Sequence, residues 1–251
     1  MTQEFGLIGH PLGHSFSAGF FAEKFKREQI NAVYLNFDLP TIEDIKDVLA
    51  QHPSLRGFNV TIPYKLAILP YLTTLSKEAA EMGAVNVVRI VTNEKGERQL
   101  WGYNTDVIGF CNSIQPLLRP HHLRALVLGT GGASKAIVYG LKKLGIAPTF
   151  VSRTPHEGML SYAELNAEVM HSHHIVVNCS PVGMYPHHEA APELPYELLT
   201  SAHLCYDLVY NPEETTFMKL SKARGAQVKN GLEMLHLQAL AAWDIWNAPG
   251  L

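Results

Sequence analysis

The sequence is poor in cysteine and in charged residues. Its 251 residues include three cysteines, Cys111, Cys179 and Cys205, which lie far apart. An odd number of distant cysteines predicts neither a disulfide framework nor a zinc site. Charged residues make up 17% of the chain, the formal net charge is -3, and lysine and arginine do not cluster. This balance argues against a nucleic-acid-binding surface.

Long hydrophobic runs are also missing. No stretch approaches the roughly 20 apolar residues that a membrane-spanning helix needs. The first four residues, Met-Thr-Gln-Glu, do not follow the basic and then apolar pattern of a secretory signal. We therefore expect a cytoplasmic protein that makes no contact with a membrane. Hydrophobic residues still make up 47% of the chain, which is enough for a substantial core.

Histidine is abundant, but its arrangement does not predict a metal site. The histidines occur in three groups without cysteine or carboxylate partners at ligand spacing. These groups are His121-His122, His171 with His173-His174, and His187-His188. Each group falls in a polar connecting stretch, so we interpret them as solvated loop residues and expect no metal.

A glycine-rich turn lies near the middle of the chain, between a predicted strand and a predicted helix. The apolar run 123–128 is followed by Gly129-Thr130-Gly131-Gly132-Ala133-Ser134 and then by a helical stretch at 136–144. A turn without side chains lets backbone N–H groups approach a pyrophosphate, and the helix N-terminus adds partial positive charge. Ser134 replaces the third glycine of the usual pattern, so an ordinary tight turn stays an alternative at this point.

Strand-like and helix-like segments alternate on both sides of this turn. Before it, the pattern predicts strands at 5–8, 32–37, 57–60, 85–91 and 99–103. It also predicts helices at 20–27 and 76–82, and a further helix that begins at Thr41 with Asp44 as its capping partner. The last two strands resemble a hairpin, so the first sheet should be mixed. After the turn it predicts strands at 149–151, 175–177, 204–209 and 227–229, and a helix at 216–224.

The closing segment, 232–246, carries apolar residues on one helical face and should dock onto the first half of the chain. We therefore predict an α/β fold in two lobes. A mixed-sheet substrate-binding domain covers 1–103 and is completed by the C-terminal helix at 232–251. A Rossmann-like dinucleotide-binding domain covers 104–231, with a connecting helix at 106–118.

Lys65 is the first candidate for chemistry. It follows the predicted strand that contains Asn59 and continues through Thr61 into a proline-stiffened turn. Side chains at the carboxyl ends of strands face the ligand crevice of open α/β sheets. A lysine there can bind an anion, protonate a carbonyl or remain solvated. Asn59 and Thr61 point the same way at period two, which favours a recognition surface.

Asp106 is the second candidate, at the junction of a strand and the connecting helix. It or Thr105 can serve simply as a helix cap. A lysine and an aspartate in one crevice can also hold a substrate hydroxyl and relay its proton.

Ser15, Ser17 and Asn86 form a third set. The two serines precede a predicted helix, where capping is the simplest role, although two hydroxyls and free helix N–H groups also suit a carboxylate. Asn86 can join them or be a buried amide with backbone partners.

The strand ending at 151 is followed by Ser152-Arg153-Thr154, about 20 residues beyond the glycine turn, where NAD-specific sites usually carry an acid. The absence of an acid and the presence of Arg153 favour NADP, because arginine pairs with a 2′-phosphate. An exposed loop arginine is the alternative.

These segments, in their shared order, resemble the shikimate dehydrogenase family over nearly the whole chain. The segments that carry the resemblance are Ser15-Phe16-Ser17, Asn59 to Lys65, Gly83-Ala84-Val85-Asn86, Asn104-Thr105-Asp106, the glycine turn, Ser152-Arg153-Thr154, Asn178 to Met184, Asp207 to Pro212, and Asn230 to Leu235.

The resemblance implies NADPH-dependent reduction of 3-dehydroshikimate to shikimate in aromatic amino-acid (chorismate) biosynthesis. Lys65 and Asp106 match the family's catalytic pair. Positions that hold the substrate's carboxylate and hydroxyls match Ser15, Ser17, Thr61, Asn86, Tyr210 and Gln238. Gly231 and Met234 would lie near the nicotinamide, and the cofactor turn would comprise Gly129, Gly131, Gly132 and Ala133, with Ser152, Arg153 and Thr154.

The chain departs from the family pattern in three places. Ala18-Gly19-Phe20-Phe21 stands where the family usually has Pro and then His-Asn, and Val87 replaces a common Thr. Pro155-His156-Glu157 lacks the second basic group often found after Thr154, which leaves use of both NAD and NADP open.

Two other functions fit the same residues. One is a quinate/shikimate dehydrogenase that uses both cofactors, and the other is an inactive NADP-sensing homologue. The presence of both Lys65 and Asp106 argues against the sensor, which needs neither. The expected partner is a small molecule, and the chain is expected to be a monomer or a homodimer.

Overall fold

The computed structural model describes residues 2–13 and 16–249. The chain forms two compact units, which we describe separately. Unit 1 comprises Met1–Thr105 and Ala239–Leu251, and unit 2 comprises Asp106–Gln238. Among the described residues, no helix is long and apolar enough to cross a membrane, and no group of three or more His, Cys, Asp or Glu residues is arranged to hold a metal ion.

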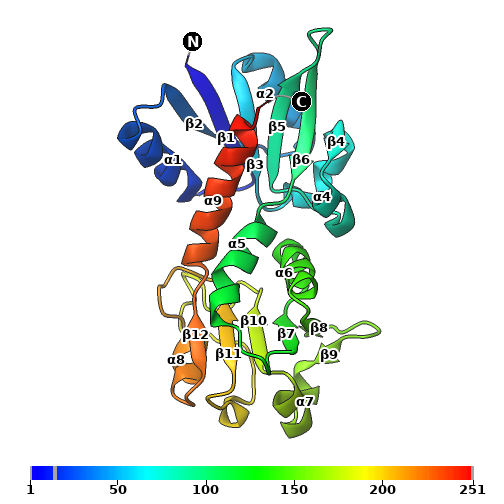
Figure 1. Ribbon diagram of the computed structural model, residues 1–251, viewed down its shortest axis with the longest axis vertical. Coiled ribbons are helices and arrows are strands. Elements are labelled where there is room, and N and C mark those ends of the chain that lie inside the picture. The colour runs from blue at the N-terminus through cyan, green and yellow to red at the C-terminus, as the bar shows by residue number, and fades with distance from the viewer. Residues whose placement is uncertain (1, 14–15, 250–251) are drawn as a thin grey trace. The chain divides into compact units, whose positions relative to one another are not determined.

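Unit 1 is built on a mixed six-stranded sheet with the order β2-β1-β3-β5-β6-β4 (Figure 1). β1 pairs in parallel with β2 and β3. β5 lies between β3 and β6 and is antiparallel to both. The predicted mixed sheet and the β5–β6 hairpin are confirmed. The strands are β1 (Gln3–Gly9), β2 (Ala32–Asp38), β3 (Leu55–Val60), β4 (Thr74–Leu75), β5 (Val87–Thr92) and β6 (Arg98–Tyr103).

Helices connect these strands. The N–H of Thr41 donates to Asp44 Oδ2 over 3.1 Å, which confirms the predicted cap and opens a 3-10 turn (Ile42–Asp44) before α2. Ser76 Oγ accepts the Ala79 N–H over 3.2 Å and caps α4. The helices are α1 (Phe16–Arg27), α2 (Ile45–Gln51), α3 (Tyr64–Ala67) and α4 (Lys77–Met82).

The C-terminal half of α9 (Leu232–Asn247) packs into unit 1, as its apolar face predicts. Ala239 and Ala242 are fully buried and Trp246 is 2% exposed, in one cluster with Phe5 of β1. Gly57 makes this approach possible, because a Cβ there would overlap the Trp246 ring. The indole N–H donates to Val88 O over 3.0 Å and anchors the ring to the sheet.

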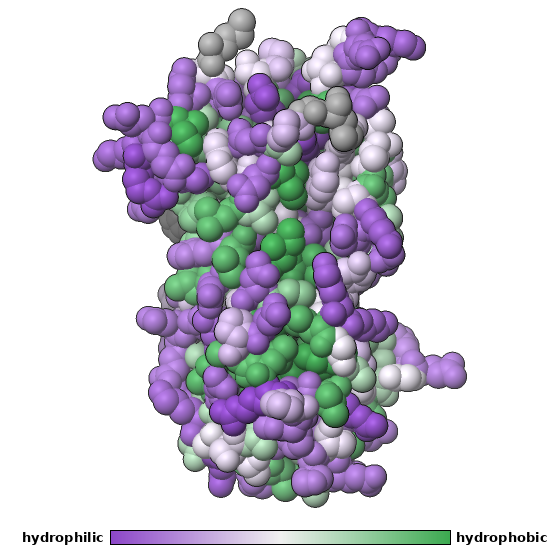
Figure 2. Space-filling model, in the orientation of Figure 1, coloured by the Kyte–Doolittle hydropathy of each residue, from purple (hydrophilic) through white to green (hydrophobic). Residues whose placement is uncertain are grey.

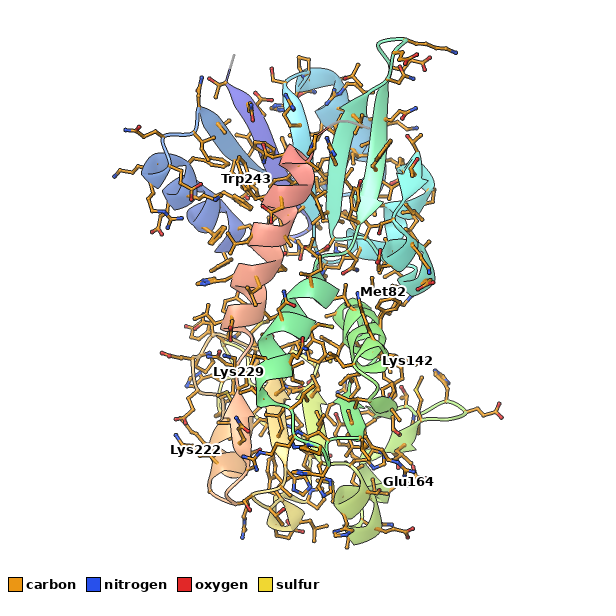
Figure 3. The ribbon with its side chains drawn as sticks, viewed as in Figure 1. Met82, Lys142, Glu164, Lys222, Lys229 and Trp243 are labelled. Atoms are coloured by element: carbon orange, nitrogen blue, oxygen red, sulfur yellow. The ribbon has the colours of Figure 1, made fainter. Side chains whose placement is uncertain are left out.

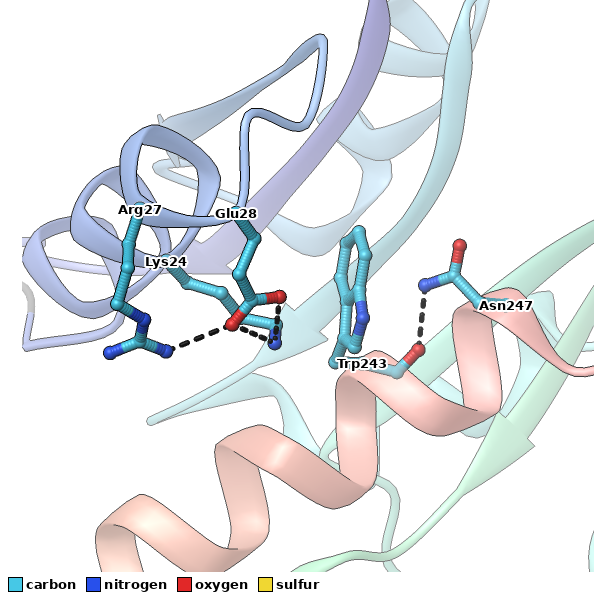
Figure 4. A network of polar contacts seen from close by, with 5 residues as sticks. All are labelled: Lys24, Arg27, Glu28, Trp243 and Asn247. Carbon is cyan, nitrogen blue, oxygen red and sulfur yellow. Dashed lines mark hydrogen bonds and ion pairs between the residues drawn. The ribbon is translucent and has the colours of Figure 1, made fainter.

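A buried cation joins α1 to α9. Lys24 is 8% exposed, and its Nζ lies 2.7 Å and 2.9 Å from the two carboxylate oxygens of Glu28 (Figure 4). The same ammonium lies 5.4 Å from the ring centroid of Trp243, which projects from α9 toward α1 (Figure 3). The outer surface of α1 is hydrophilic (Figure 2). This helix therefore presents an aromatic inner face and a charged outer face.

Unit 2 contains a six-stranded, fully parallel sheet with the order β12-β11-β10-β7-β8-β9. Counted from β7, this order is 3-2-1-4-5-6, which is typical of doubly wound dinucleotide-binding sheets. Its strands are β7 (Arg124–Leu128), β8 (Ala147–Ser152), β9 (Leu160–Ser161), β10 (Ile175–Asn178), β11 (Leu204–Asp207) and β12 (Gln227–Lys229). Its helices are α5 (Asp106–Ile114), α6 (Gly132–Lys143), α7 (Ala167–Ser172), α8 (Thr216–Lys222) and the start of α9. The predicted two-domain α/β class is confirmed.

Several predicted boundaries were wrong. α1 begins at Phe16 rather than at residue 20, so Ser17 lies inside the helix instead of preceding it. α6 begins at Gly132, four residues earlier than predicted, because glycine weakens a helix interior but is tolerated in its first turn. The elements α3, α7, β4 and β9 were missed, since segments of two to six residues are too short to show a period.

The interpretation of the histidines as solvated loop residues was also wrong in part. His122 is 4% exposed and its Nδ1 accepts the Arg119 N–H over 3.0 Å. His173 is 8% exposed, with Nδ1 2.9 Å from Val169 O. Burial lowers the pKa of both imidazoles. They are neutral structural groups, held by backbone partners that spacing along the sequence does not reveal.

Candidate active site

The polar candidates of unit 1 gather at one end of its sheet. β1 and β3 end there, β5 begins there, and β6 returns to it at Tyr103. Asn59 and Thr61 come from the end of β3, and Asn86 directly precedes β5. This arrangement follows from the register, in which Asn59 lies opposite Val87. The sheet thus brings Asn59 close to Asn86, which lies 27 positions later in the chain.

Asn86 and Thr105 form a buried pair. Asn86 is 3% exposed and Thr105 is fully buried. The Thr105 N–H donates to Asn86 Oδ1 over 2.7 Å, and Asn86 Nδ2 donates to Thr105 Oγ1 over 3.1 Å. The backbone oxygen of Asn86 accepts from the Val60 N–H over 2.8 Å and from Asn59 Nδ2 over 3.4 Å. Asn86 therefore fixes the backbone just before Asp106.

Lys65 lies on α3, one residue after Tyr64, and is half-buried. The Tyr64 N–H donates to Thr61 O over 2.8 Å, and the Tyr64 hydroxyl donates to Leu39 O. The backbone oxygen of Lys65 accepts the Val85 N–H over 2.8 Å. These bonds hold the short helix against the sheet end, so the position of Lys65 is set by its backbone.

Ser17 reaches the same sheet through Tyr34. Tyr34 donates to Asn59 Oδ1 over 2.7 Å and is itself hydrogen-bonded to Ser17. Burial raises the pKa of Tyr34, so it stays a neutral phenol. Ser15 lies outside the described residues.

Asp106 is the first residue of α5 and belongs to unit 2, where it is 7% exposed. Lys65 belongs to unit 1. The two predicted catalytic groups are thus contributed by different units, and their pairing stays a prediction.

The glycine turn of unit 2 has the form of an anion cradle. Gly129 has φ +95° and donates its N–H to Val151 O over 2.9 Å. Gly131 has open space where a Cβ would stand, and it precedes the 12-residue helix α6 with no side-chain cap on the first helical N–H groups. Ser134, which replaces the third glycine, is buried and bonds back to Gly131 O over 2.7 Å. An uncapped helix start beside bare backbone suits a pyrophosphate.

The turn lies at the point where the strand order reverses. β7 has β8 on one side and β10 on the other. The chain passes from β7 to β8 and β9 on the first side and then crosses to β10 on the second. A Cβ on Gly129 would meet Ser180, which follows β10, at 3.4 Å. Ligands of doubly wound sheets bind at such a switch point.

The turn at the end of β8 carries an arginine and no acid. Ser152 Oγ accepts the Thr154 N–H over 3.2 Å and shapes the turn. Arg153 is exposed at its tip, and no carboxylate stands at positions 152–154. An arginine without an adjacent acid fits a 2′-phosphate and does not repel it.

A buried network at the ends of β10 and β11 was missed as a functional feature of the sequence. Asp207, fully buried, accepts hydrogen bonds from Asn178 Nδ2 (2.9 Å), the Val209 N–H (3.0 Å) and Thr215 Oγ1 (2.6 Å). Asn178 Oδ1 in turn accepts from Ser180 Oγ over 2.6 Å. Burial raises the pKa of Asp207 to about 6, against these hydrogen bonds, which lower it. The network holds the loops that follow β10 and β11. Its only signal in the sequence is that a polar residue, Asn178 or Asp207, ends each of these strands.

The remaining candidates differ in exposure. Tyr210 is 38% exposed after β11, whereas Gln238 and Met234 on α9 are 7% and 8% exposed. Met234 packs in the core of unit 2, and Gln238 Nε2 donates to Leu235 O within the helix over 2.9 Å. Gly231 is required where it stands, because a Cβ would overlap Leu208 O.

The chain is similar in sequence and in structure to several known proteins. Residues 7–88 match the family model described as the shikimate dehydrogenase substrate-binding domain. A protein of Caldanaerobacter subterraneus named shikimate dehydrogenase (NADP(+)) is 36% identical, over 98% of this chain and 91% of its own length. The shikimate dehydrogenase structure from Aquifex aeolicus is 34% identical with a TM-score of 0.84, covering 100% of this chain and 94% of its own. The Thermus thermophilus shikimate 5-dehydrogenase, solved with NADP(H) and shikimate, is 32% identical with a TM-score of 0.84, covering 98% and 94%.

Proposed function

This chain belongs to the shikimate dehydrogenase family, and we propose that it catalyses the reversible NADPH-dependent reduction of 3-dehydroshikimate to shikimate. One observation carries the proposal. A single chain combines a lysine held at the polar end of a mixed sheet with a glycine cradle at the switch point of a 3-2-1-4-5-6 sheet. The first suits a carbonyl or hydroxyl group, and the second suits a dinucleotide.

Unit 2 is proposed to hold the cofactor. Gly129, Gly131, Gly132 and Ala133 would cradle the pyrophosphate with backbone N–H groups, and Arg153 would pair with the 2′-phosphate between Ser152 and Thr154. Gly231 and Met234 are proposed near the nicotinamide. When bound, NADPH supplies the hydride. The Asn178–Asp207 network would keep the loops beside the nicotinamide in one conformation.

Unit 1 is proposed to hold the substrate. Ser15, Ser17, Thr61, Asn86, Tyr210 and Gln238 are the proposed contacts to its carboxylate and hydroxyls, the last two coming from unit 2. Lys65 would hold a proton at Nζ and give it to the carbonyl oxygen as negative charge develops there. Asp106 would orient the ammonium and accept a hydrogen bond from the neighbouring hydroxyl. Asn86 would contact the substrate, and its amide oxygen also holds the Thr105 N–H and so fixes the backbone before Asp106.

A substrate screen tests the proposal. The purified chain is assayed by NADPH absorbance with shikimate and with quinate, each with NADP+ and with NAD+. We expect the largest kcat/KM for shikimate with NADP+. A higher value for quinate, or for NAD+, would identify the dual-specificity enzyme instead. Tight NADP+ binding without turnover of either substrate would identify a cofactor sensor.

A further inference from the structure

Unit 1 has a pocket at the opposite end of its sheet from Lys65. It encloses about 530 Å³ and is lined by the start of β3, the end of β5, the start of β6 and the residues that follow α9. β3 runs from Leu55, in this pocket, to Val60, beside the candidate site. Figure 1 shows the C-terminal end of α9 beside the same end of β5. The two sites of unit 1 are therefore separated by the length of a strand.

Three arginines from three strands line this pocket: Arg56 on β3, Arg89 on β5 and Arg98 on β6. Arg56 lies at an irregularity in the β1–β3 ladder, where Leu55 pairs with Glu4 and Gly57 with Phe5, so it is the extra residue of a bulge. Arg89 lies opposite Gly57 in the β3–β5 pairing. Arg56 therefore directly precedes Gly57, the residue that pairs with Arg89.

None of these arginines has a carboxylate partner among the described residues. Arg89 donates to Ala248 O, and Arg98 donates to Leu49 O over 2.7 Å and to Leu55 O over 3.1 Å. Burial lowers the pKa of Arg98. Arg56 is exposed. Other cations of the protein do have acids beside them: Lys24 and Arg27 share Glu28, Lys222 has Glu214, and Lys229 has Glu233.

The backbone bonds orient the guanidinium groups without neutralising them. Each guanidinium has five N–H donors, and a carbonyl oxygen carries no net charge to offset the cation. Arg89 and Arg98 therefore keep both charge and donors for a further acceptor. Ile90 and the buried Trp246 add apolar groups to the lining, and a guanidinium beside apolar groups makes stronger charge-assisted hydrogen bonds than one in open water.

We propose that this pocket binds a small anion with two or more carboxylate or phosphate groups. Guanidinium pairs with both oxyanions through two parallel N–H bonds, and several cations favour a multiply charged ligand over a monoanion. The volume lies within the range of small-molecule pockets. The site is independent of the proposed catalytic site, since it shares no residue with it.

Calorimetric titration of the full chain with pyrophosphate and with citrate, at constant ionic strength, tests this site. We expect saturable binding of at least one of the two anions. Arg56→Gln should weaken it about tenfold or more, as expected for the loss of a charge-assisted contact. Because Arg56 is exposed, this variant should keep its fold, which circular dichroism checks. Arg89→Gln should have a similar effect but also removes a bond to the residue after α9.

Two matched variants locate the binding. Arg27→Gln removes an exposed arginine elsewhere on unit 1, and Arg153→Gln removes the one proposed to bind the cofactor phosphate. Both should leave the affinity unchanged. Binding of pyrophosphate alone would define a phosphate ligand, and binding of citrate alone a carboxylate ligand. An affinity that Arg56→Gln leaves unchanged, which would place the anion elsewhere, such as at the glycine cradle of unit 2, or no saturable binding of either anion, would overturn the proposal.

Discussion

Each unit of this protein holds a buried asparagine at the end of its sheet, but the two asparagines have different partners. In unit 1, Asn86 bonds to Thr105, so every group in the pair is neutral. In unit 2, Asn178 bonds to Asp207, which also holds Val209 and Thr215. The same task, fixing a loop at the end of a sheet, is done once with neutral groups and once around a carboxylate. Of these two networks, the one in unit 2 should therefore be the more sensitive to pH.

The largest effect is expected from separating the proposed proton donor of unit 1 from the proposed cofactor residues of unit 2. Lys65→Ala should lower kcat about 10³-fold, because it removes the proposed proton donor of unit 1. The affinity for NADP+ should stay within about twofold by titration, because the cofactor residues of unit 2 are untouched. Lys95→Ala, at the tip of the β5–β6 hairpin, is the control. Turnover like that of the wild type in Lys65→Ala would refute the assignment.

Removal of the carboxylate should distinguish the two networks by stability. Asp207→Ala leaves the donors of Asn178, Val209 and Thr215 buried without an acceptor, so we expect a loss of about 4 kcal/mol in the free energy of unfolding. Urea unfolding followed by circular dichroism measures it. A loss below about 1 kcal/mol would mean that water or a loop shift replaces the carboxylate.

The pH dependence of Asp207 sharpens the comparison. Its pKa is about 6 in the folded chain against an ordinary 3.8, so the folded state binds the proton more tightly. Its contribution to stability is then largest below pH 3.8 and is lost as the pH rises to 6, a change of about 3 kcal/mol.

The matched variant is Asp207→Asn, which cannot titrate. As the pH falls from 7 to 4, the unfolding free energy of the wild type should rise relative to that of Asp207→Asn. A difference that does not change with pH would place the carboxyl pKa near its ordinary value.

The neutral network should respond less. Asn86→Ala removes the acceptor of the Thr105 N–H and should cost about 2 kcal/mol. The cost should be the same at pH 4.5 and pH 7, because the partners described above, Thr105, Asn59 and the Val60 N–H, do not titrate there. Urea titration at the two pH values measures it, and a pH-dependent cost would show that a charged group is coupled to Asn86.

The smallest effect concerns the buried histidines of unit 2. Burial lowers the pKa of His122, His173 and His203, so they stabilise the fold above their ordinary pKa and that stability is lost as the pH falls. This trend is opposite to that of Asp207. His173→Gln should reduce the loss of stability between pH 7.5 and pH 5.5 by under about 1 kcal/mol. An unchanged acid response would show that His173 has the same pKa in the folded and the unfolded chain.

Much of the architecture was predictable because it depends on local pattern. The hairpin of β5 and β6, the parallel strands of unit 2 and the helix after the glycine turn all follow from hydrophobic period and turn residues. The short helix that carries Lys65 was not predictable, since it is held by distant segments: Lys65 O accepts the Val85 N–H, and the Tyr64 hydroxyl donates to Leu39 O.

The sequence by itself determined the family, the fold class and the residue types that the proposed chemistry needs, because these depend on the order of motifs along the chain. Only the tertiary structure decided which polar groups meet. Asn86 finds Thr105, Asn178 finds Asp207, and three arginines from separate strands line one pocket. Strand register sets each of these meetings, and register is a property of pairing between distant segments rather than of any one of them.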